Sequence, residues 1–123
     1  MFEELIGKTI TSIQGAEKGS KDVLFVCNDG GMYKMSHYQD CCESVEVEDV
    51  CGNIDDLLNT PVVQAFEKTN DNQNPEGVPI SDLQESFTWT FYTITTIKGS
   101  VTIRWYGESN GFYSESVDFD KIN

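Results

Sequence analysis

The last third of the chain alternates apolar and polar residues so regularly that it restricts the fold to antiparallel β-structure. Residues 87–119, FTWTFYTITTIKGSVTIRWYGESNGFYSESVDF, are rich in the aromatic and β-branched residues that favour strands. Two breaks that contain glycine, at Lys98-Gly99 and between Gly107 and Gly111, divide this segment into three predicted strands.

Residues two apart share one face of a strand, so the alternation also predicts which side chains lie together. The first predicted strand has an aromatic face, formed by Phe87, Trp89 and Phe91. The second has an apolar face of Val101, Ile103 and Trp105. Its opposite face is polar and aromatic, with Thr102, Arg104 and Tyr106.

The third predicted strand returns along the second, with Tyr106 paired to Phe112 and Trp105 to Tyr113. This register leaves Glu115 on the apolar side, opposite Ile103. A carboxylate there needs a hydrogen-bonding partner or a place near the end of the sheet.

Residues 22–38, DVLFVCNDGGMYKMSHY, predict a second hairpin. A turn at Asp29-Gly30 pairs Val26 with Tyr33 and continues the face of Tyr33 to His37. Cys27 then lies on the opposite face, which argues against a site that contains both Cys27 and His37.

The middle of the chain adds two strands, a short helix and a loop. Residues 44–50 alternate, with Val45 and Val47 facing inward, and residues 62–69 predict another strand. Asn53 is the expected N-cap of a short helix, and the polar stretch 70–86 predicts a long loop. Residues 1–123 therefore predict a single domain of the α+β class, mainly β, with a bent antiparallel sheet or partly closed barrel and one short helix.

The chain has 21 acidic residues, 8 basic residues and a formal net charge of −13. Residues 35–67 contain carboxylates but no Lys or Arg. A field of this sign disfavours direct nucleic-acid binding and favours a basic partner or a bound cation. The alternative is a solvated acidic face. No long apolar run or secretion signal is present, so we expect no membrane contact, a cytoplasmic location and four reduced cysteines.

The chain's single arginine marks the first candidate site. Guanidinium binds carboxylate and phosphate oxygens and stacks on aromatic rings, so the residues around it predict a small polar-aromatic pocket for an anionic or nucleotide-like ligand. The expected ligand-binding residues are Arg104, Tyr106, Ser109, Asn110, Phe112 and Ser114. The alternative is an ordinary hairpin turn beside an arginine that pairs with one of the chain's own carboxylates.

The second candidate site contains the only histidine. Zinc binding through His37, one of Cys41 or Cys42, and Cys51 is one interpretation, although the paired spacings of zinc modules are absent. Consecutive cysteines on a strand point apart, so only one of them is expected to reach a site. The alternative is a bend in which the histidine satisfies the backbone and the cysteines pack.

Catalytic signatures are missing. The sequence has no phosphate-binding Gly-rich loop with Lys, no G-x-S-x-G and no EF-hand pattern, so we expect a protein without catalytic residues or a cofactor. A zinc- or thiol-dependent enzyme that uses His37 and the cysteines is the remaining catalytic alternative.

Two segments resemble a family of small phage and bacterial proteins of unknown function. They are H-x-Q-D-C-C-E at residues 37–43 and W-Y-G-E-S-N-G-[YF]-Y-S-E at residues 105–115, where Phe112 stands in place of the usual tyrosine. The resemblance covers most of the chain except residues 70–86. It implies a phage-associated setting, in the host cytoplasm, where small proteins often act by binding.

Two binding functions follow as hypotheses. The first is capture of a nucleotide-like ligand, with sequestration of a host immune signal and a homo-oligomeric pocket as one form of it. The second is an acidic inhibitor that imitates DNA and covers a basic surface of a host protein. The second hypothesis predicts that the carboxylates of residues 43–56 form one continuous face.

Overall fold

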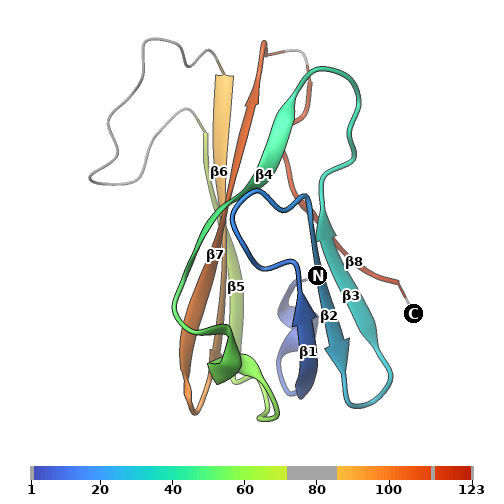
Figure 1. Ribbon diagram of the computed structural model, residues 1–123, viewed down its shortest axis with the longest axis vertical. Helices are drawn as coiled ribbons and strands as arrows, with labels where there is room; N and C mark the ends of the chain where they lie inside the picture. The colour runs from blue at the N-terminus through green and yellow to red at the C-terminus, as the bar shows by residue number, and fades with distance from the viewer. Residues whose placement is uncertain (1, 72–85, 112, 123) are drawn as a thin grey trace.

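The computed structural model describes residues 2–71, 86–111 and 113–122, which form two antiparallel sheets of four strands each. The sheets pack face to face as a sandwich that is not closed into a barrel (Figure 1). The predicted mainly-β antiparallel class is therefore confirmed. No helix among the described residues is long and apolar enough to cross a membrane.

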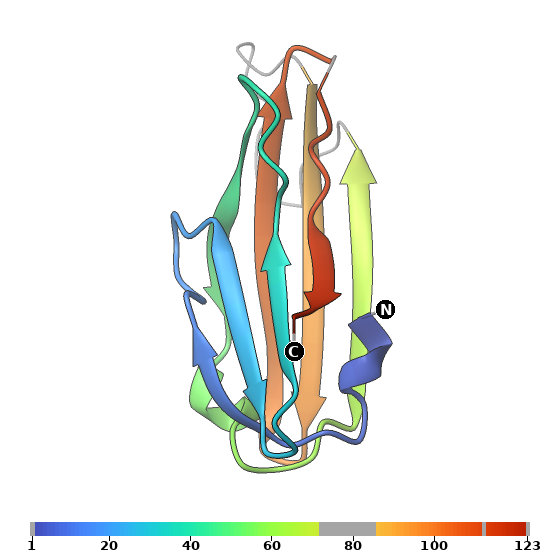
Figure 2. The same ribbon diagram turned by 90° about the vertical axis from the view of Figure 1, so that its right-hand side faces the viewer.

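The sheet with the shorter strands, which we call the smaller sheet, has the strand order β1-β2-β3-β8. Its strands are β1 (Ile10–Gln14), β2 (Asp22–Cys27), β3 (Met32–Ser36) and β8 (Asp118–Lys121). The larger sheet has the order β4-β7-β6-β5 and lies behind the smaller one in Figure 2. Its strands are β4 (Ser44–Cys51), β5 (Gln64–Asp71), β6 (Ser86–Thr96) and β7 (Gly99–Ser109).

Two 3-10 turns, η1 (Phe2–Leu5) and η2 (Ile54–Leu57), provide the helical structure of the described residues. The expected N-cap of η2 is confirmed, because the Asn53 side chain accepts a hydrogen bond of 3.0 Å from the Asp55 N–H. Four residues are too few for an α-helix of useful length, so the expected helix is a single tight turn.

The core lies between the sheets and consists of the inward-facing residues of the alternating strands. Trp105 and Ile103 of β7 are completely buried, as the alternation predicts. Rings from the smaller sheet meet them there, with Tyr33 stacked on Phe119 at 5.4 Å between ring centroids. Full burial of each such side chain contributes about 1.5–3 kcal/mol, so this layer stabilises the sandwich.

The β2–β3 hairpin differs from the predicted register by one residue. Phe25, rather than Val26, pairs with Tyr33. The connection is longer than the expected turn, because Asp29 Oδ1 accepts the Gly31 N–H at 2.8 Å and the Cys27 N–H donates to the Gly31 carbonyl at 2.8 Å. Tyr33 and Cys27 consequently face the same core, which corrects the expectation that they lie on opposite faces.

The predicted last hairpin does not form. β7 continues through Gly107 to Ser109, with β6 on one side and β4 on the other, so neither edge is left for a returning strand. Residues 113–117 are not a strand, and the chain crosses to the smaller sheet, where Phe119 of β8 pairs with Met35. The expected Trp105–Tyr113 pair is therefore absent. Phe112 lies outside the described residues, as do residues 72–85 of the predicted loop.

Gly107 serves close packing instead of a turn. A Cβ atom at this position would lie 3.0 Å from the Cβ of Glu115 and 3.0 Å from a methyl group of Val45. The crossing segment 113–117 is therefore pressed against β7 at a point where a side chain would collide with it.

Candidate binding site at the loop end of the sandwich

Both sequence segments of interest meet at one end of the sandwich, drawn at the top of Figure 1. We call this the loop end. It consists of the connections 37–43, 110–111 and 113–117, with the adjoining strand ends 71, 86–88 and 107–109. One direct link joins the two connections, since His37 Nδ1 lies 2.7 Å from the carbonyl oxygen of Ser116.

The connection between β3 and β4 is organised around the buried carboxylate of Glu43. Its Oε2 lies 2.8 Å from His37 Nε2 and accepts the Asp40 N–H at 2.9 Å. Its Oε1 accepts the Cys41 N–H at 2.8 Å and the Gln39 side-chain amide at 3.1 Å. We call this arrangement the Glu43 hub. Its four donors all come from the segment that precedes the carboxylate, so the chain folds back on itself here.

The hub is shielded from solvent, and its carboxylate is stabilised in the ionised form. The side chains of Glu43 and His37 are 0% and 4% exposed. Burial opposes ionisation of Glu43, but the N–H groups of Cys41 and Asp40 and the bond from His37 outweigh it and lower the pKa of Glu43 to about 2. Both ring nitrogens of His37 are thus engaged by oxygen atoms of the chain, Nε2 by Glu43 and Nδ1 by the carbonyl of Ser116.

Cys41 and Cys42 are joined by a disulfide, while Cys27 and Cys51 are free thiols. The expectation of four reduced cysteines is therefore corrected for this pair. The expectation that their side chains point apart is also wrong, because residues 41 and 42 form a bend and not a strand.

The predicted zinc ligands do not converge. His37 uses both ring nitrogens within the chain, and Cys51 lies at the far end of β4, where its sulfur is 3.9 Å from Asp49 Oδ1. Within residues 2–71, 86–111 and 113–122, no three His, Cys, Asp or Glu side chains are grouped to hold a metal ion.

Arg104 forms a bidentate pair with Asp49 on the outer face of the larger sheet. Its Nε donates to Asp49 Oδ1 at 2.6 Å, and its Nη2 donates to Oδ2. Its guanidinium also lies 5.4 Å from the ring centroid of Trp89. A bulge in β4 between Val47 and Asp49 brings Asp49 directly opposite Arg104, and the pair lowers the pKa of Asp49. Of the two interpretations of Arg104, the structure therefore has the one in which the arginine pairs with a carboxylate of its own chain.

The other expected ligand-binding residues are distributed along β7 and beyond it. The Tyr106 hydroxyl donates to Glu108, and Ser109 donates to Glu115 while it accepts the Gly111 N–H at 3.0 Å. Ser114 is hydrogen-bonded to Ser116, and Asn110 follows the end of β7. Of the expected set, Ser109, Asn110 and Ser114 belong to the loop end, whereas Arg104 and Tyr106 lie on the outer face of the sheet.

Glu115 has the partners that its apolar position requires. Thr88 Oγ1 donates to its Oε1 at 2.7 Å, and Ser109 donates to its Oε2. The side chain is buried near the end of the sheet. The sequence indicated that this residue needs a partner but did not identify Thr88, which precedes it by 27 residues.

The carboxylates of residues 43–56 do not form the continuous face that the DNA-mimic hypothesis predicts. Glu43 is buried, Asp49 pairs with Arg104, and Glu48 lies 3.8 Å from the ammonium group of Lys18. Asp55 and Asp56 belong to η2, at the end of the sandwich opposite the loop end (Figure 1).

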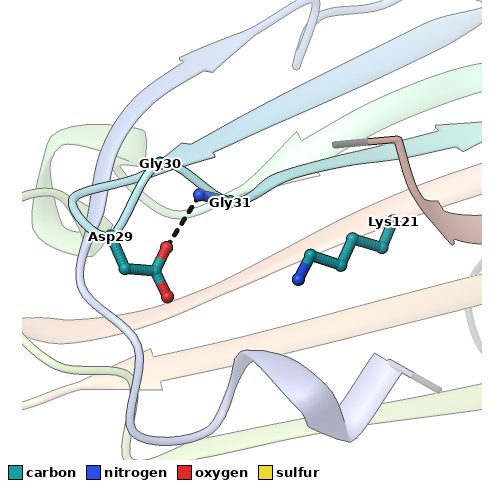
Figure 3. A pocket seen from close by; sticks show the side chains of 4 residues that line it. All are labelled: Asp29, Gly30, Gly31 and Lys121. Carbon is teal, nitrogen blue, oxygen red and sulfur yellow. Dashed lines mark hydrogen bonds between the residues drawn. The ribbon is translucent and has the colours of Figure 1, made fainter.

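A pocket of about 360 Å³ lies at the turn between β2 and β3, at the end of the sandwich opposite the loop end (Figure 1). It is lined by Asp29, Gly30, Gly31 and Lys121 (Figure 3). The Asp29 carboxylate also accepts a hydrogen bond of 2.8 Å from the ammonium group of Lys8. This bond, together with the Gly31 N–H, lowers the pKa of Asp29. None of the expected site residues that the structure describes lines this pocket.

Comparison with curated proteins and with solved structures gave no match. Comparison with protein-family models gave one that spans residues 3–119, almost the entire chain, and describes a domain of unknown function. The chain therefore belongs to the DUF7448 family.

Proposed function

We propose that this protein is a non-catalytic binding module and that its loop end binds a partner with a basic surface. The observation that carries the proposal is the rigid presentation of Tyr38, which is 81% exposed, by the Glu43 hub. An aromatic side chain this exposed contributes nothing to the core and is available to a partner.

The hub supports binding because it fixes the loop before any partner arrives. Glu43 is hydrogen-bonded to residues on both sides of Tyr38 in the chain. They are His37 before it and Asp40 and Cys41 after it. A loop that is already ordered loses less conformational entropy on association than a flexible one. Binding residues are frequently held on loops in this way.

Charge gives the chemistry of the partner. The described residues of the loop end include the exposed carboxylates of Asp40, Asp71 and Glu108, and they contain no Lys or Arg. A positively charged surface is complementary to this end, and the net charge of −13 attracts such a partner over longer distances.

Capture of a nucleotide-like anion is the less favoured function. Around Arg104 and at the loop end, the donor groups described above are already occupied by carboxylates of the chain. Asp49 occupies Arg104, Glu43 occupies the N–H groups of residues 40 and 41, and Glu115 occupies Ser109. A phosphate would have to displace one of them.

The test is binding of fluorescent Lys/Arg-rich peptides and of acidic control peptides by the parent protein and two variants. Tyr38→Ala is expected to weaken the binding of basic peptides about tenfold, the effect of losing an aromatic anchor. Ile97→Ala is the matched control, because Ile97 is 82% exposed at the opposite end of the sandwich. Equal losses in both variants would contradict the proposed surface.

A nucleotide panel separates the two binding functions. We expect no thermal stabilisation of the parent by cyclic di- or trinucleotides. A shift that disappears in Arg104→Ala would instead support anion capture, since a ligand at 100 times its Kd raises stability by about 2.7 kcal/mol.

A further inference from the structure

We propose that Cys41 and Cys42 form a reversible thiol–disulfide site that exchanges electrons with low-molecular-weight thiols and disulfides. The inference does not depend on what binds the loop end. It rests on the exposure of the two residues, on the absence of a stabilising role for their bond, and on the hydrogen bond by which Glu43 holds the backbone of Cys41.

The pair is accessible, in contrast to the chain's best-protected thiol. Cys41 and Cys42 are both exposed residues of the connection before β4. Cys27 is 2% exposed, and burial raises the pKa of its thiol, which suppresses its reactivity. Cys51 is exposed but is a single thiol. An external reagent therefore reaches one pair and one isolated cysteine.

The bond between Cys41 and Cys42 cannot stabilise the fold as structural disulfides do. Such a disulfide acts mainly by closing a long loop in the unfolded chain, and its effect grows with the length of that loop. Here the linked residues are adjacent in sequence, so the bond closes no loop beyond the dipeptide itself. Since the bond gives little stability, its loss on reduction leaves the fold unchanged.

The Glu43 hub holds the backbone of Cys41, and with it the start of the adjacent Cys42, in both redox states. The Cys41 N–H donates to Glu43 at 2.8 Å, and the Cys41 carbonyl accepts from the Gln39 amide at 3.2 Å. On the cysteine side these bonds use only the backbone N–H and carbonyl of Cys41, so they are independent of the sulfurs. After reduction the thiols remain neighbours at a high effective concentration, which favours re-formation of the bond.

The external thiol supplies the two electrons that reduce the disulfide. Its thiolate attacks one cysteine sulfur, the bond between the two cysteines breaks, and the other sulfur leaves as a thiolate that takes up a proton. A second molecule of external thiol then attacks the mixed disulfide and releases the first cysteine as a thiol. The external thiol is oxidised to its disulfide and the cysteine pair is reduced. An external disulfide reverses the sequence.

Thiol counting in denaturant, after treatment of the folded protein with glutathione disulfide or with dithiothreitol, tests the proposal. The parent is expected to show four thiols in the second case and at most two in the first, because glutathione can also attach to the exposed Cys51. The matched control Cys51→Ser removes this side reaction and should show one thiol in the first case and three in the second. Peptide mapping should find Cys41 linked to Cys42. Four thiols after both treatments, or a bond to Cys27 or Cys51, would overturn the proposal.

Phenylarsine oxide supplies an independent readout, because trivalent arsenic binds two neighbouring thiols far more tightly than one. The reduced parent and reduced Cys51→Ser should each bind one equivalent, and Cys41→Ser should lose this binding. Reduction of the parent should shift the Tm by less than about 2 °C, given the absence of loop closure. Arsenical binding that is equal in Cys41→Ser, or a large fall in Tm on reduction, would contradict the site.

Discussion

The only arginine and the only histidine of the chain each pair with a carboxylate, and the two pairs do different things. On the outer face of the larger sheet, the only arginine, Arg104, meets Asp49 with side chains 23% and 39% exposed. At the loop end, the only histidine, His37, meets Glu43 with side chains 4% and 0% exposed. The first pair is partly screened by water, and the second is not.

The contrast extends to what each carboxylate holds. Asp49 contacts a side chain on a neighbouring strand, and the backbones of β4 and β7 are already hydrogen-bonded to each other. Glu43 accepts N–H groups from residues 40 and 41, which lie in no strand. A carboxylate that replaces missing backbone partners determines the local conformation, whereas one added to a regular sheet adjusts its stability.

The isosteric substitutions Glu43→Gln and Asp49→Asn test this contrast most strongly. We expect Glu43→Gln to lower the Tm by about 10 °C, because a buried amide has only one accepting oxygen and leaves two of the four donors without an acceptor. Asp49→Asn should lower it by only about 2 °C, because water reaches the pair. The measurement is thermal unfolding followed by circular dichroism. Equal shifts would show that the hub is no more important than the surface pair.

Acid should weaken the hub within a defined pH range. The pKa of Glu43 is about 2 in the folded protein, below the value of 4.5 that is ordinary for this side chain. Its ionised form is therefore favoured by folding, and its contribution is fully present above pH 4.5 and is lost as the pH falls toward 2.

Urea unfolding across this pH range measures that contribution. The free energy of unfolding of the parent should fall more steeply below pH 4.5 than that of Glu43→Gln, which has no carboxyl group to titrate at this position. Other carboxylates, including Asp49 and Asp29, have lowered pKa values and titrate in both proteins, so the difference between the two curves isolates Glu43. Parallel curves would contradict the assignment.

The surface pair should respond weakly to a change of cation. Arg104→Lys keeps the charge but removes the two-pronged geometry and the contact with Trp89. We expect a loss of about 0.5–1 kcal/mol, since exposure of Asp49 discounts the interaction. Urea unfolding at low and high salt measures it, and the deficit should shrink as salt screens the parent's pair. A deficit that is unchanged by salt would assign the effect to packing on Trp89.

Sequence reasoning succeeded where the relevant contacts are local. The β6–β7 hairpin joins Thr96 to Gly99 through two residues, and alternation alone identifies the inward face of β7. The aromatic residues Trp89 and Phe91 of β6 pair with Tyr106 and Arg104 on the outer face instead. It failed where a contact depends on other strands. The last hairpin was excluded by β4, which occupies the free edge of β7 from more than 50 residues earlier in the chain. No pattern within residues 105–117 records that occupancy.

The candidate site follows the same division. Arg104 could be singled out as the only arginine, but its partner is one of 21 acidic residues, and the choice of Asp49 depends on a bulge in β4. Glu43 was visible at the end of the H-x-Q-D-C-C-E segment, yet its role requires the chain to reverse around it, which side-chain periodicity does not describe. A polar cluster that ends in an acidic residue just before a strand is the signal that was available.

Tyr38→Ala should have the smallest effect on stability. It distinguishes the contribution of the hub from that of the Tyr38 side chain, which the hub holds in place. Tyr38 is 81% exposed, so its removal should change the Tm by less than about 1 °C. Amide hydrogen exchange gives the sharper comparison. The N–H groups of Asp40 and Cys41 should exchange slowly in the parent and in Tyr38→Ala, because both are bonded to Glu43, and quickly in Glu43→Gln. Rapid exchange in the parent would mean that the loop is not held before binding, and Tyr38 would then lose the rigid support on which its proposed role depends.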